Sequence, residues 1–458
     1  MVHKTSTRQF IEEGFLVGKQ ILQNNYLRYS MNEELLHYVW KFQLFNSLGL
    51  MTTEHESVQV IKPGSQNFDA GPDFFNGQVK IGETLWVGNI EIHTKSSHWF
   101  VHKHQFDENY SKIILHVVWE DDQSVVQKNG QKVPTIELKG LIQKSVFDKY
   151  DVLQNSRTWI PCESEIGKVD QFIKVQVMER MMIDRLETKS NRLNQMLSLT
   201  KNDWEASLFQ LLAKYFGFKV NAVPFELLAT SIDFNIIRKY RNSEKQLLAL
   251  LFGQAGFLNE NLNGNFPQEL NREYLFLANK HQLHALGQNM WKFMRMRPSN
   301  FPTIRIAQFT SIFANNLNLF QSILEAESVG QLQDKFKVSA HEYFNSHYRF
   351  DVPAAKNEAK HLGKSSVDVI LINVVIPLLF NYGRLMADET IQERALSFLQ
   401  EIKWEKNAIT KKWKDLGMPI STAYDSQALI QLKNENCSNK KCLICAIGTS
   451  ILKPNKND

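Results

Sequence analysis

Cysteine is scarce in this sequence, and so are long apolar runs and an excess of charge of either sign. Four cysteines in 458 residues are too few for a disulfide scaffold. The strongest apolar run, residues 367–380, is interrupted by Asp368, Asn373 and Pro377. It falls short of the roughly 20 residues that a bilayer span requires, so we expect a buried helix. The N-terminus has no sustained apolar stretch of the export-signal type. These absences predict a cytoplasmic protein with no membrane partner.

The charge balance is only mildly basic. A formal net charge of +5 permits a nucleic-acid partner but does not by itself indicate one. What the sequence has in quantity is core material, with 43% hydrophobic residues, 30 phenylalanines and nine tryptophans. A length of 458 residues suggests two or three domains of a soluble, well-packed protein.

Hydrophobic periodicity divides the chain into zones and predicts an α+β fold. Residues 1–30 suggest one or two helical turns around Phe10 to Leu22. Residues 31–150 suggest a helix followed by a sheet, and residues 151–165 a linker that contains Cys162. Residues 166–435 have the pattern of a large all-helical domain, and residues 436–458 form a cysteine-containing tail. No repeat of fixed period is present.

The second zone begins with a helix whose N-cap is Asn32 and then changes to a period of two. Strands are expected over residues 58–61, 75–81, 85–94, 113–119, 125–127 and 133–138. Gly82-Glu83 and Asn129-Gly130 would supply two-residue hairpin turns, the second of type I′.

Two carboxylates in this zone are the strongest functional signal. Asp73 ends a Gly-Pro-Asp bend, and Glu91 lies on the strand paired with it through the first hairpin. Because side chains alternate along a strand, Glu91, His93 and Lys95 share one face. Adjacent carboxylates repel unless a cation lies between them, and Mg²⁺ or Mn²⁺ takes such oxygen ligands. The alternative is that Asp69 and Asp73 cap a turn and that residues 91–95 form a solvated sheet face.

Pro72-Asp73, a hairpin and Glu91-Ile92-His93 together resemble the active-site motif of the PD-(D/E)XK nuclease superfamily. The resemblance implies a restriction-endonuclease-like core of a helix and a mixed sheet, with Asp73 and Glu91 binding the metal. His93 stands where that superfamily has lysine, so Lys95, two residues on, is the candidate replacement. Asp69 is a further candidate metal ligand. Glu34 is our candidate for the glutamate that the superfamily often takes from the preceding helix.

Much of the chain also resembles a bacterial family known only as domain of unknown function 2851. The segments that carry this resemblance are Asp69-Ala70-Gly71-Pro72-Asp73-Phe74, Gly88-Asn89-Ile90-Glu91-Ile92-His93, Ile114-Leu115-His116-Val117-Val118-Trp119, Leu251-Phe252-Gly253-Gln254-Ala255-Gly256 and the cysteine tail. The family name implies no activity. Its pattern has aspartate where this chain has His98, so an essential carboxylate at that position is not expected.

Histidines follow the carboxylate motif at positions 98, 102, 104 and 116. Their spacing is not that of a helical or hairpin zinc site. We therefore expect phosphate contact or loop packing from the first three, and a hydrogen-bonded strand residue in His116.

Three cysteines cluster in the tail as Cys437-x4-Cys442-x2-Cys445, and the fourth is Cys162. Four thiols are the number that closes a tetrahedral Zn²⁺ site or holds a [4Fe-4S] cluster. Lys440, Lys441 and Lys453 would lower the thiol pKa values and favour the thiolates. A reduced, metal-free tail is the alternative.

Basic residues in the helical zone are candidate phosphate contacts, although a solvated helix face has the same pattern. They are Arg185, Lys189 and Arg192 on one long helix, and Arg297 and Arg305 in and beside a later loop. The sequence thus predicts a divalent-metal-dependent nuclease that acts on DNA or RNA, with DNA favoured over RNA as the partner. The alternatives are a catalytically inactive nucleic-acid-binding protein on a nuclease fold and a metal-dependent hydrolase of a small phosphorylated compound. The oligomeric state is not predicted.

Overall fold

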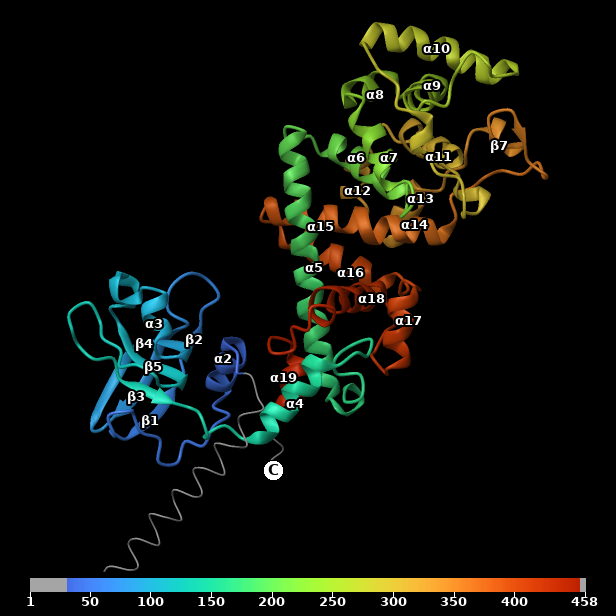
Figure 1. Ribbon diagram of the computed structural model, residues 1–458. Coiled ribbons are helices and arrows are strands. Elements are labelled where there is room, and N and C mark those ends of the chain that lie inside the picture. Colours follow the sequence, from blue (N-terminus) through green and yellow to red (C-terminus); the bar gives the residue numbers. More distant parts are fainter. Residues whose placement is uncertain (1–30, 454–458) are drawn as a thin grey trace, which may run out of the picture. The chain divides into compact units, whose positions relative to one another are not determined.

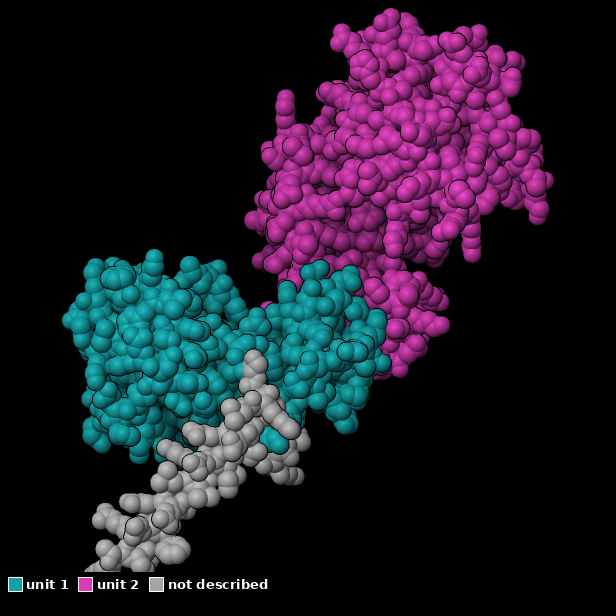
Figure 2. Space-filling view, viewed as in Figure 1, with its two compact units in different colours: residues 1–177, 433–458 teal, residues 178–432 magenta. Residues whose placement is uncertain are grey.

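The structure is a computed structural model that describes residues 31–453 (Figure 1). The helical turns expected around Phe10 to Leu22 lie outside the described residues. The chain divides into two compact units, shown in teal and magenta in Figure 2. Unit 1 comprises residues 1–177 and 433–458, and unit 2 comprises residues 178–432. The cysteine tail therefore belongs to the same unit as the sheet.

A mixed sheet forms the centre of unit 1. Its strands are β1 (Val58–Lys62), β2 (Ser65–Gln66), β3 (Phe74–Ile81), β4 (Thr84–Lys95), β5 (Ile113–Glu120) and β6 (Thr135–Glu137). Their order is β1-β3-β4-β5-β6, and β2 pairs with the first two residues of β3. The pairs β1–β3 and β3–β4 are antiparallel, whereas β4–β5 and β5–β6 are parallel. With the helices described below, this sheet confirms the expected α+β fold class.

The two turns differ in how well the sequence predicted them. β3 and β4 join through Gly82-Glu83 as expected, with Gly82 at a positive φ of 55°. At Asn129-Gly130 the expected type I′ turn is wrong, because only Gly130 has a positive φ, of 81°. The Gly130 amide donates to Gln127 O, so Lys128 and Asn129 are the central residues of the turn. Gly130 then provides the left-handed residue that follows a type I turn in a longer hairpin loop.

Helix α2 (Glu33–Phe42) precedes the sheet and lies alongside it (Figure 1). Asn32 caps it by accepting a hydrogen bond from the Leu35 amide, as expected. Leu35, Leu36, Val39 and Trp40 bury its apolar face. The crossover between the parallel strands β4 and β5 holds α3 (His98–Val101), η1 (His104–Phe106) and η2 (Glu108–Tyr110). This crossover carries three of the four histidines singled out above.

The rest of unit 1 is helical. It contains α4 (Lys144–Asn155), η3 (Ile166–Lys168), the first residues of α5 (Gln171–Leu199), nearly all of η8 (Leu432–Cys437) and α19 (Ala446–Leu452). The Tyr38 hydroxyl of α2 donates to Thr449 O, so α19 is tied to α2.

Unit 2 is formed mainly of helices, and residues 178–199 of α5 belong to it. Further helices follow along the chain. They are α6 (Trp204–Phe216), α7 (Ala222–Thr230), α8 (Phe234–Tyr240), α9 (Glu244–Gln254), α10 (Asn265–His281), η4 (Gln288–Met290), η5 (Pro298–Asn300), α11 (Pro302–Asn315), α12 (Leu319–Leu324), α13 (Val329–Lys335), η6 (Glu342–Asn345), α14 (Lys364–Ile370), η7 (Leu371–Val375), α15 (Ile376–Leu385), α16 (Glu389–Glu401), α17 (Ala408–Asp415) and α18 (Ala423–Gln431). A small hairpin, β7 (His347–Arg349) and β8 (Val352–Pro353), interrupts them. Helices α11 and α12 are separate because the chain leaves the helical conformation at Asn316.

The apolar run of the sequence forms α14, η7 and α15 in succession. Among the described residues, Lys364–Leu385 is the one helix long and apolar enough to cross a membrane, and 72% of its most apolar window is buried inside the structure. A core helix of a soluble protein passes the same test, so this is weak evidence for a membrane span. Leu371, Val374, Leu378 and Leu379 are fully buried, in agreement with the buried helix that the sequence predicted.

Candidate metal centre

Asp73 and Glu91 lie together because of the β3–β4 hairpin. Asp73 immediately precedes β3, and its neighbour Phe74 pairs with Ile90 of β4. The Asp73 amide donates to Glu91 Oε2 at 3.3 Å, and the Ile92 amide donates to Asp73 Oδ2 at 2.9 Å. Glu91 is only 4% exposed. The backbone amide of Asp73 therefore holds the Glu91 carboxylate, and the backbone amide of Ile92 holds the Asp73 carboxylate.

Helix α2 adds two side chains to this pair. The carboxylate of Glu33, the imidazole of His37 and the carboxylate of Asp73 offer ligand atoms that all lie within 4.8 Å of one another. His37 Nε2 is 3.3 Å from Asp73 Oδ2, yet this buried nitrogen has no hydrogen-bond partner. Glu33 and His37 are four residues apart and so share one face of the helix. A carboxylate–histidine–carboxylate set of this kind suits a divalent metal.

The charges in this set explain its altered pKa values. Burial, and then the negative charge of Asp73, raise the pKa of Glu91 above its ordinary value, and the same two causes raise the pKa of Glu33. Burial lowers the pKa of His37, but the facing carboxylates of Asp73, Glu33 and Glu91 outweigh it, so the net shift is upward. Each shift favours uptake of a proton. The set is therefore short of positive charge, which a bound cation would supply.

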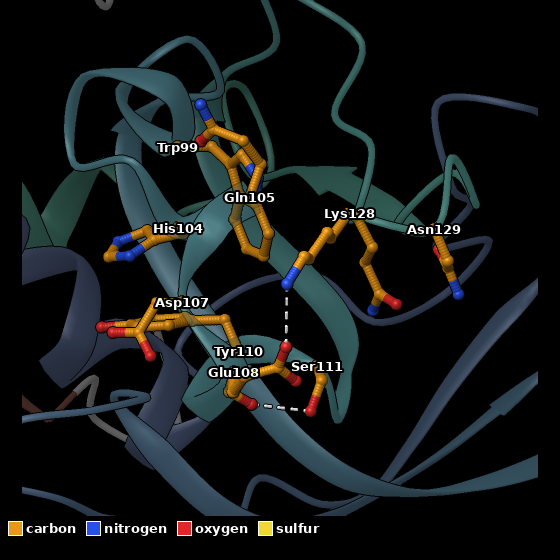
Figure 3. Close-up of a pocket in the computed structure, with 10 residues that line it drawn as sticks. Trp99, His104, Gln105, Asp107, Glu108, Tyr110, Ser111, Lys128 and Asn129 are labelled. Atoms are coloured by element: carbon orange, nitrogen blue, oxygen red, sulfur yellow. Dashed lines mark hydrogen bonds and ion pairs between the residues drawn. The ribbon is translucent and has the colours of Figure 1, made fainter.

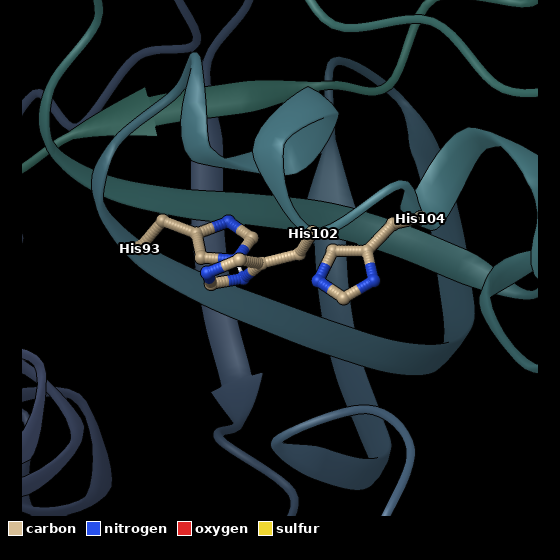
Figure 4. A group of neighbouring side chains, drawn as sticks. All are labelled: His93, His102 and His104. Atoms are coloured by element: carbon tan, nitrogen blue, oxygen red, sulfur yellow. Dashed lines mark hydrogen bonds between the residues drawn. The ribbon is translucent and has the colours of Figure 1, made fainter.

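A second set of side chains lies on the other side of Glu91. His93 comes from β4, and His102 and His104 come from the crossover (Figure 4). One nitrogen from each of the three rings lies within 4.8 Å of the other two. His93 Nε2 is 3.1 Å from His102 Nδ1 and 3.5 Å from Glu91 Oε1. His104 Nε2 is 3.2 Å from the same Glu91 oxygen.

His116 supports this second set from β5. It pairs with Glu91 in the sheet, and its Nε2 lies 2.8 Å from His93 Nδ1. Both rings are fully buried. Burial is the main cause that lowers the pKa of His93 far below its usual range and that of His116 to about 3, so both imidazoles are neutral at physiological pH. The expectation of a hydrogen-bonded strand residue at position 116 agrees with this contact.

A cavity of about 310 Å³ adjoins His104 (Figure 3). His104 lines it together with Trp99, Tyr110 and a polar rim that includes Glu108 and Lys128, whose side chains form an ion pair at 3.1 Å. The rings of His104 and Tyr110 stack with centroids 3.7 Å apart. His104 therefore connects the candidate metal centre to a space that a small polar group could enter.

The comparisons with known proteins give one positive result. A family model described as "Protein of unknown function (DUF2851)" matches residues 33–408. The chain belongs to this family. No curated protein and no solved structure matches the chain. The DUF2851 match covers α2, the whole sheet and the crossover, so every side chain of the two sets lies inside the family's own region.

Two residues proposed for the site from the sequence lie away from both sets. Glu34 is exposed, and its charge contributes, after burial, to the raised pKa of Tyr150. Glu33 takes the place that we had given to Glu34. Asp69 is exposed in the loop before β3, where its backbone bonds with the Asn67 side chain.

Lys95 also differs from the expectation. It lies at the end of β4 with its side chain 50% exposed, and its Nζ is 3.8 Å from Asp122 Oδ2. Asp122 in turn accepts hydrogen bonds from the Ser97 amide and from the Ser96 and Ser97 hydroxyls. These hydrogen bonds from Ser96 and Ser97 to Asp122 form a clamp that holds the start of the crossover, and Lys95 lies beside it. The polar face of β4 is not solvated at Glu91 and His93, because the crossover covers it.

Three of the five candidate phosphate-binding residues are engaged inside unit 2. Arg305 is 5% exposed and donates to Gln308, Asn300 and Ser366. Arg185 donates to Gln431 Oε1. Lys189 donates to the carbonyl and side-chain oxygens of Asn373, and Pro377, four residues later, has no amide hydrogen to offer that carbonyl. These three residues therefore have structural partners.

Arg192 and Arg297 remain exposed. The Arg192 guanidinium lies 3.8 Å from Glu226.

The four cysteines lie in one part of unit 1. Cys162 and Cys442 are buried, and Cys437 and Cys445 are partly buried. Burial first, and then the nearby Cys445 and Cys442, raise the pKa of Cys162 to about 12. Burial and Cys445 raise that of Cys442 to about 11, against a smaller effect of Lys440. Lys440 thus lowers the pKa of Cys442 as expected, but burial and Cys445 outweigh it, so the expected net lowering of this thiol pKa is wrong.

Sequence reasoning missed Glu33, His37, His102 and His104 as members of the centre. The signal for the first pair was present as Glu33-x3-His37, a helical spacing that points two ligands the same way. His102 and His104 had no comparable signal, since only the path of the crossover brings them to Glu91.

Proposed function

We propose that this protein is a divalent-metal-dependent phosphodiesterase, with Glu33, His37, Asp73 and Glu91 as its first metal site. The observation that carries the proposal is the convergence of three carboxylates and an imidazole from α2, β3 and β4. A metal bound there would activate water and offset charge that develops on a phosphate. An imidazole ligand favours Mn²⁺ over Mg²⁺.

The architecture supports the nuclease form of this proposal. The resemblance implies a core of a helix and a mixed sheet, and a helix followed by antiparallel β1, β3 and β4 and then parallel β5 supports the proposal to that extent. The departure at His93 has a consequence for mechanism. A fully buried, neutral imidazole beside two other histidines cannot provide the fixed positive charge of a lysine. The positive charge that stabilises the reacting phosphate would therefore come from bound metal and not from a lysine side chain.

A polymeric substrate is favoured by the surroundings of His104. Exposed Lys103 and Phe106, which is 70% exposed, flank that histidine in sequence. A lysine can contact a phosphate and an exposed aromatic ring can stack on a base. Arg185, Lys189 and Arg305 no longer support this substrate class, because unit 2 uses them internally. The cavity beside His104 favours a second candidate, the hydrolysis of a small phosphorylated compound.

The test is cleavage of labelled single- and double-stranded DNA and RNA with Mn²⁺ or Mg²⁺. We expect cleavage by the wild-type protein and its loss in the double variant Asp73→Ala, Glu91→Gln. Asp69→Ala is the matched control, because it removes a nearby carboxylate that lies outside the centre, and it should retain activity. Cleavage that survives the double substitution would overturn the assignment. Binding without cleavage under either metal would instead favour an inactive nucleic-acid-binding protein.

The gathered thiols support a separate metal proposal. Burial, and then the neighbouring thiols, raise the pKa values of Cys162 and Cys437, so a cation beside the four cysteines would favour their ionisation. Cys162, Cys437, Cys442 and Cys445 are therefore proposed to hold Zn²⁺ or a [4Fe-4S] cluster with a structural role. The mutual bonds of Gln154 and Lys440, each donating to the other's carbonyl, hold the tail against α4 close to Cys442.

A further inference from the structure

Four atoms from β4 and the crossover are joined by short separations. His93 Nε2 lies 3.1 Å from His102 Nδ1 and 3.5 Å from Glu91 Oε1, and His104 Nε2 lies 3.2 Å from the same oxygen. One nitrogen from each of the three histidines lies within 4.8 Å of the other two, and Glu91 is not part of that mutual set. Ligands about 2.1 Å from a tetrahedral metal ion are about 3.4 Å from one another. The three histidines therefore offer a set of metal ligands, and the Glu91 carboxylate lies close enough to two of them to complete it.

The hydrogen bonding of these atoms gives a second, independent observation. His104 is 9% exposed, and its Nε2 is fully buried without a hydrogen-bond partner although a carboxylate oxygen lies 3.2 Å away. A buried nitrogen that is close to an acceptor but not aligned with it makes no hydrogen bond. It therefore lowers the stability of the fold unless another group contacts it. A cation placed between the nitrogen and the oxygen would contact both.

The neighbour of His93 permits the tautomer that a ligand needs. His93 Nδ1 lies 2.8 Å from His116 Nε2. If His93 Nδ1 donates to His116 Nε2, the lone pair of His93 Nε2 points toward His102 and Glu91. Metal-binding histidines characteristically donate their second ring N–H to a carboxylate, carbonyl or water, and the His116 imidazole would take that place here.

Glu91 lies between this set and the first one. Its Oε1 faces His93 and His104, whereas its Oε2 accepts from the amide of Asp73, which belongs to the Glu33–His37–Asp73 group. We propose that His93, His102, His104 and Glu91 hold a second divalent transition-metal ion, so that the centre is dinuclear with Glu91 shared. The inference deepens the proposed function and relies on it for a catalytic role, but not for the existence of the site.

The donor set indicates the class of metal. Three imidazoles and one carboxylate suit Mn²⁺, Fe²⁺ or Zn²⁺ and disfavour Mg²⁺, which prefers oxygen ligands and retained water. In two-metal phosphodiesterases the paired ions stabilise both the attacking and the leaving oxygen. A second ion would also explain why His93 replaces the expected lysine, because its charge would take over the role of that amine.

Mn²⁺ is the appropriate probe, since the thiolates of the cysteine group bind it poorly compared with Zn²⁺. The full-length protein is stripped with a chelator and titrated with Mn²⁺, and electron paramagnetic resonance counts the bound ions. We expect two bound ions with a spin-coupled spectrum in the wild type. His102→Ala should bind one ion with an uncoupled spectrum. His102 is exposed, so its truncation leaves the core intact.

His98→Ala is the matched control. This histidine lies on the same crossover, with its Nδ1 3.4 Å from Thr94 Oγ1, and it is outside the four-atom set, so two bound ions are expected. One bound ion in the wild type, or two in His102→Ala, would overturn the second site. Two ions with no cleavage of any substrate would leave this inference standing and remove the proposed function. One bound ion, together with cleavage that depends on Asp73, would remove the second site and leave the proposed function standing.

Discussion

Asp73 and Glu91 are joined through the backbone of Asp73, whose amide donates to Glu91 Oε2 at 3.3 Å. The Asp73 carboxylate is fixed in the same way by the amide of Ile92, at 2.9 Å. Neither carboxylate can therefore rotate away without losing a hydrogen bond to the facing strand. Preorganised ligands of this kind bind a metal without the entropic cost of ordering flexible side chains.

The first prediction separates two adjacent glutamates of α2. Glu33→Gln should weaken Mn²⁺ binding at the first site at least about tenfold, since even changes to residues that only support a ligand have effects of that size. Glu34→Gln should leave binding within about twofold, because its side chain is exposed on another face. Isothermal titration of both variants with Mn²⁺ measures the difference. Equal effects of the two substitutions would contradict the assignment of Glu33.

This pair of glutamates also shows what the sequence could and could not predict. The spacing of Leu35, Val39 and Phe42 predicted the helix, and Asn32 predicted its start, because both signals are local. Adjacent positions on a helix point about 100° apart, so the choice between Glu33 and Glu34 depends on how the helix lies against the sheet. No local pattern contains that information.

The sheet could be predicted because its signals are local, whereas the histidine set depends on a long-range pairing of strands. Period-two alternation, β-branched residues and the glycine turn at Gly82 fixed β3 and β4, and with them the approach of Asp73 to Glu91. His102 and His104 reach Glu91 only because a parallel pairing of β4 and β5 sends the chain back over the sheet. Parallel pairing is a long-range choice, so the sequence gives no local sign of it. The same holds for Cys162, which is far from the tail cysteines in sequence.

The second prediction concerns the clamp at the start of the crossover. Asp122 accepts three hydrogen bonds from Ser96 and Ser97. Asp122→Ala should lower the free energy of unfolding by about 1–2 kcal/mol, the range for loss of a capping carboxylate. Lys95→Met is the control and should cost less than about 0.5 kcal/mol, since its exposed ion pair with Asp122 is long, at 3.8 Å. Urea unfolding at pH 7 measures both.

The same clamp predicts a dependence on pH. Burial raises the pKa of Asp122, but the hydrogen bonds from Ser97 and Ser96 and the charge of Lys95 outweigh it, and the net shift is downward. A carboxyl group with a lowered folded-state pKa stabilises the fold fully above its unfolded-state pKa, near 3.8. That contribution is lost as the pH falls through the lower folded-state value. The stability difference between wild type and Asp122→Ala should therefore shrink below pH 4. A difference that grows on acidification would contradict this account.

The third prediction tests the cysteine group by metal removal. Purified protein should contain zinc, or iron with visible absorption, and Cys162→Ser should lose it although this residue is far from the tail in sequence. Chelation should also lower the thermal stability, because metal-binding free energy contributes to folding. Ser438→Ala, directly after Cys437 at the end of η8, is the control and should keep its metal. Elemental analysis and absorption spectra decide between the two metals. Metal-free wild-type protein would support the reduced tail instead.

The last prediction distinguishes two arginines that the sequence had grouped as phosphate contacts. Arg305 is buried and bonded to Gln308, Asn300 and Ser366. Its replacement by methionine should destabilise the protein by about 2–4 kcal/mol, because polar partners would be left unpaired in the interior. Arg297 is exposed, so Arg297→Met should leave the stability within about 0.5 kcal/mol. Any effect of Arg297→Met on nucleic-acid affinity should then decrease as salt is raised. A large loss of stability from Arg297→Met, or none from Arg305→Met, would show that the two side chains have the opposite roles.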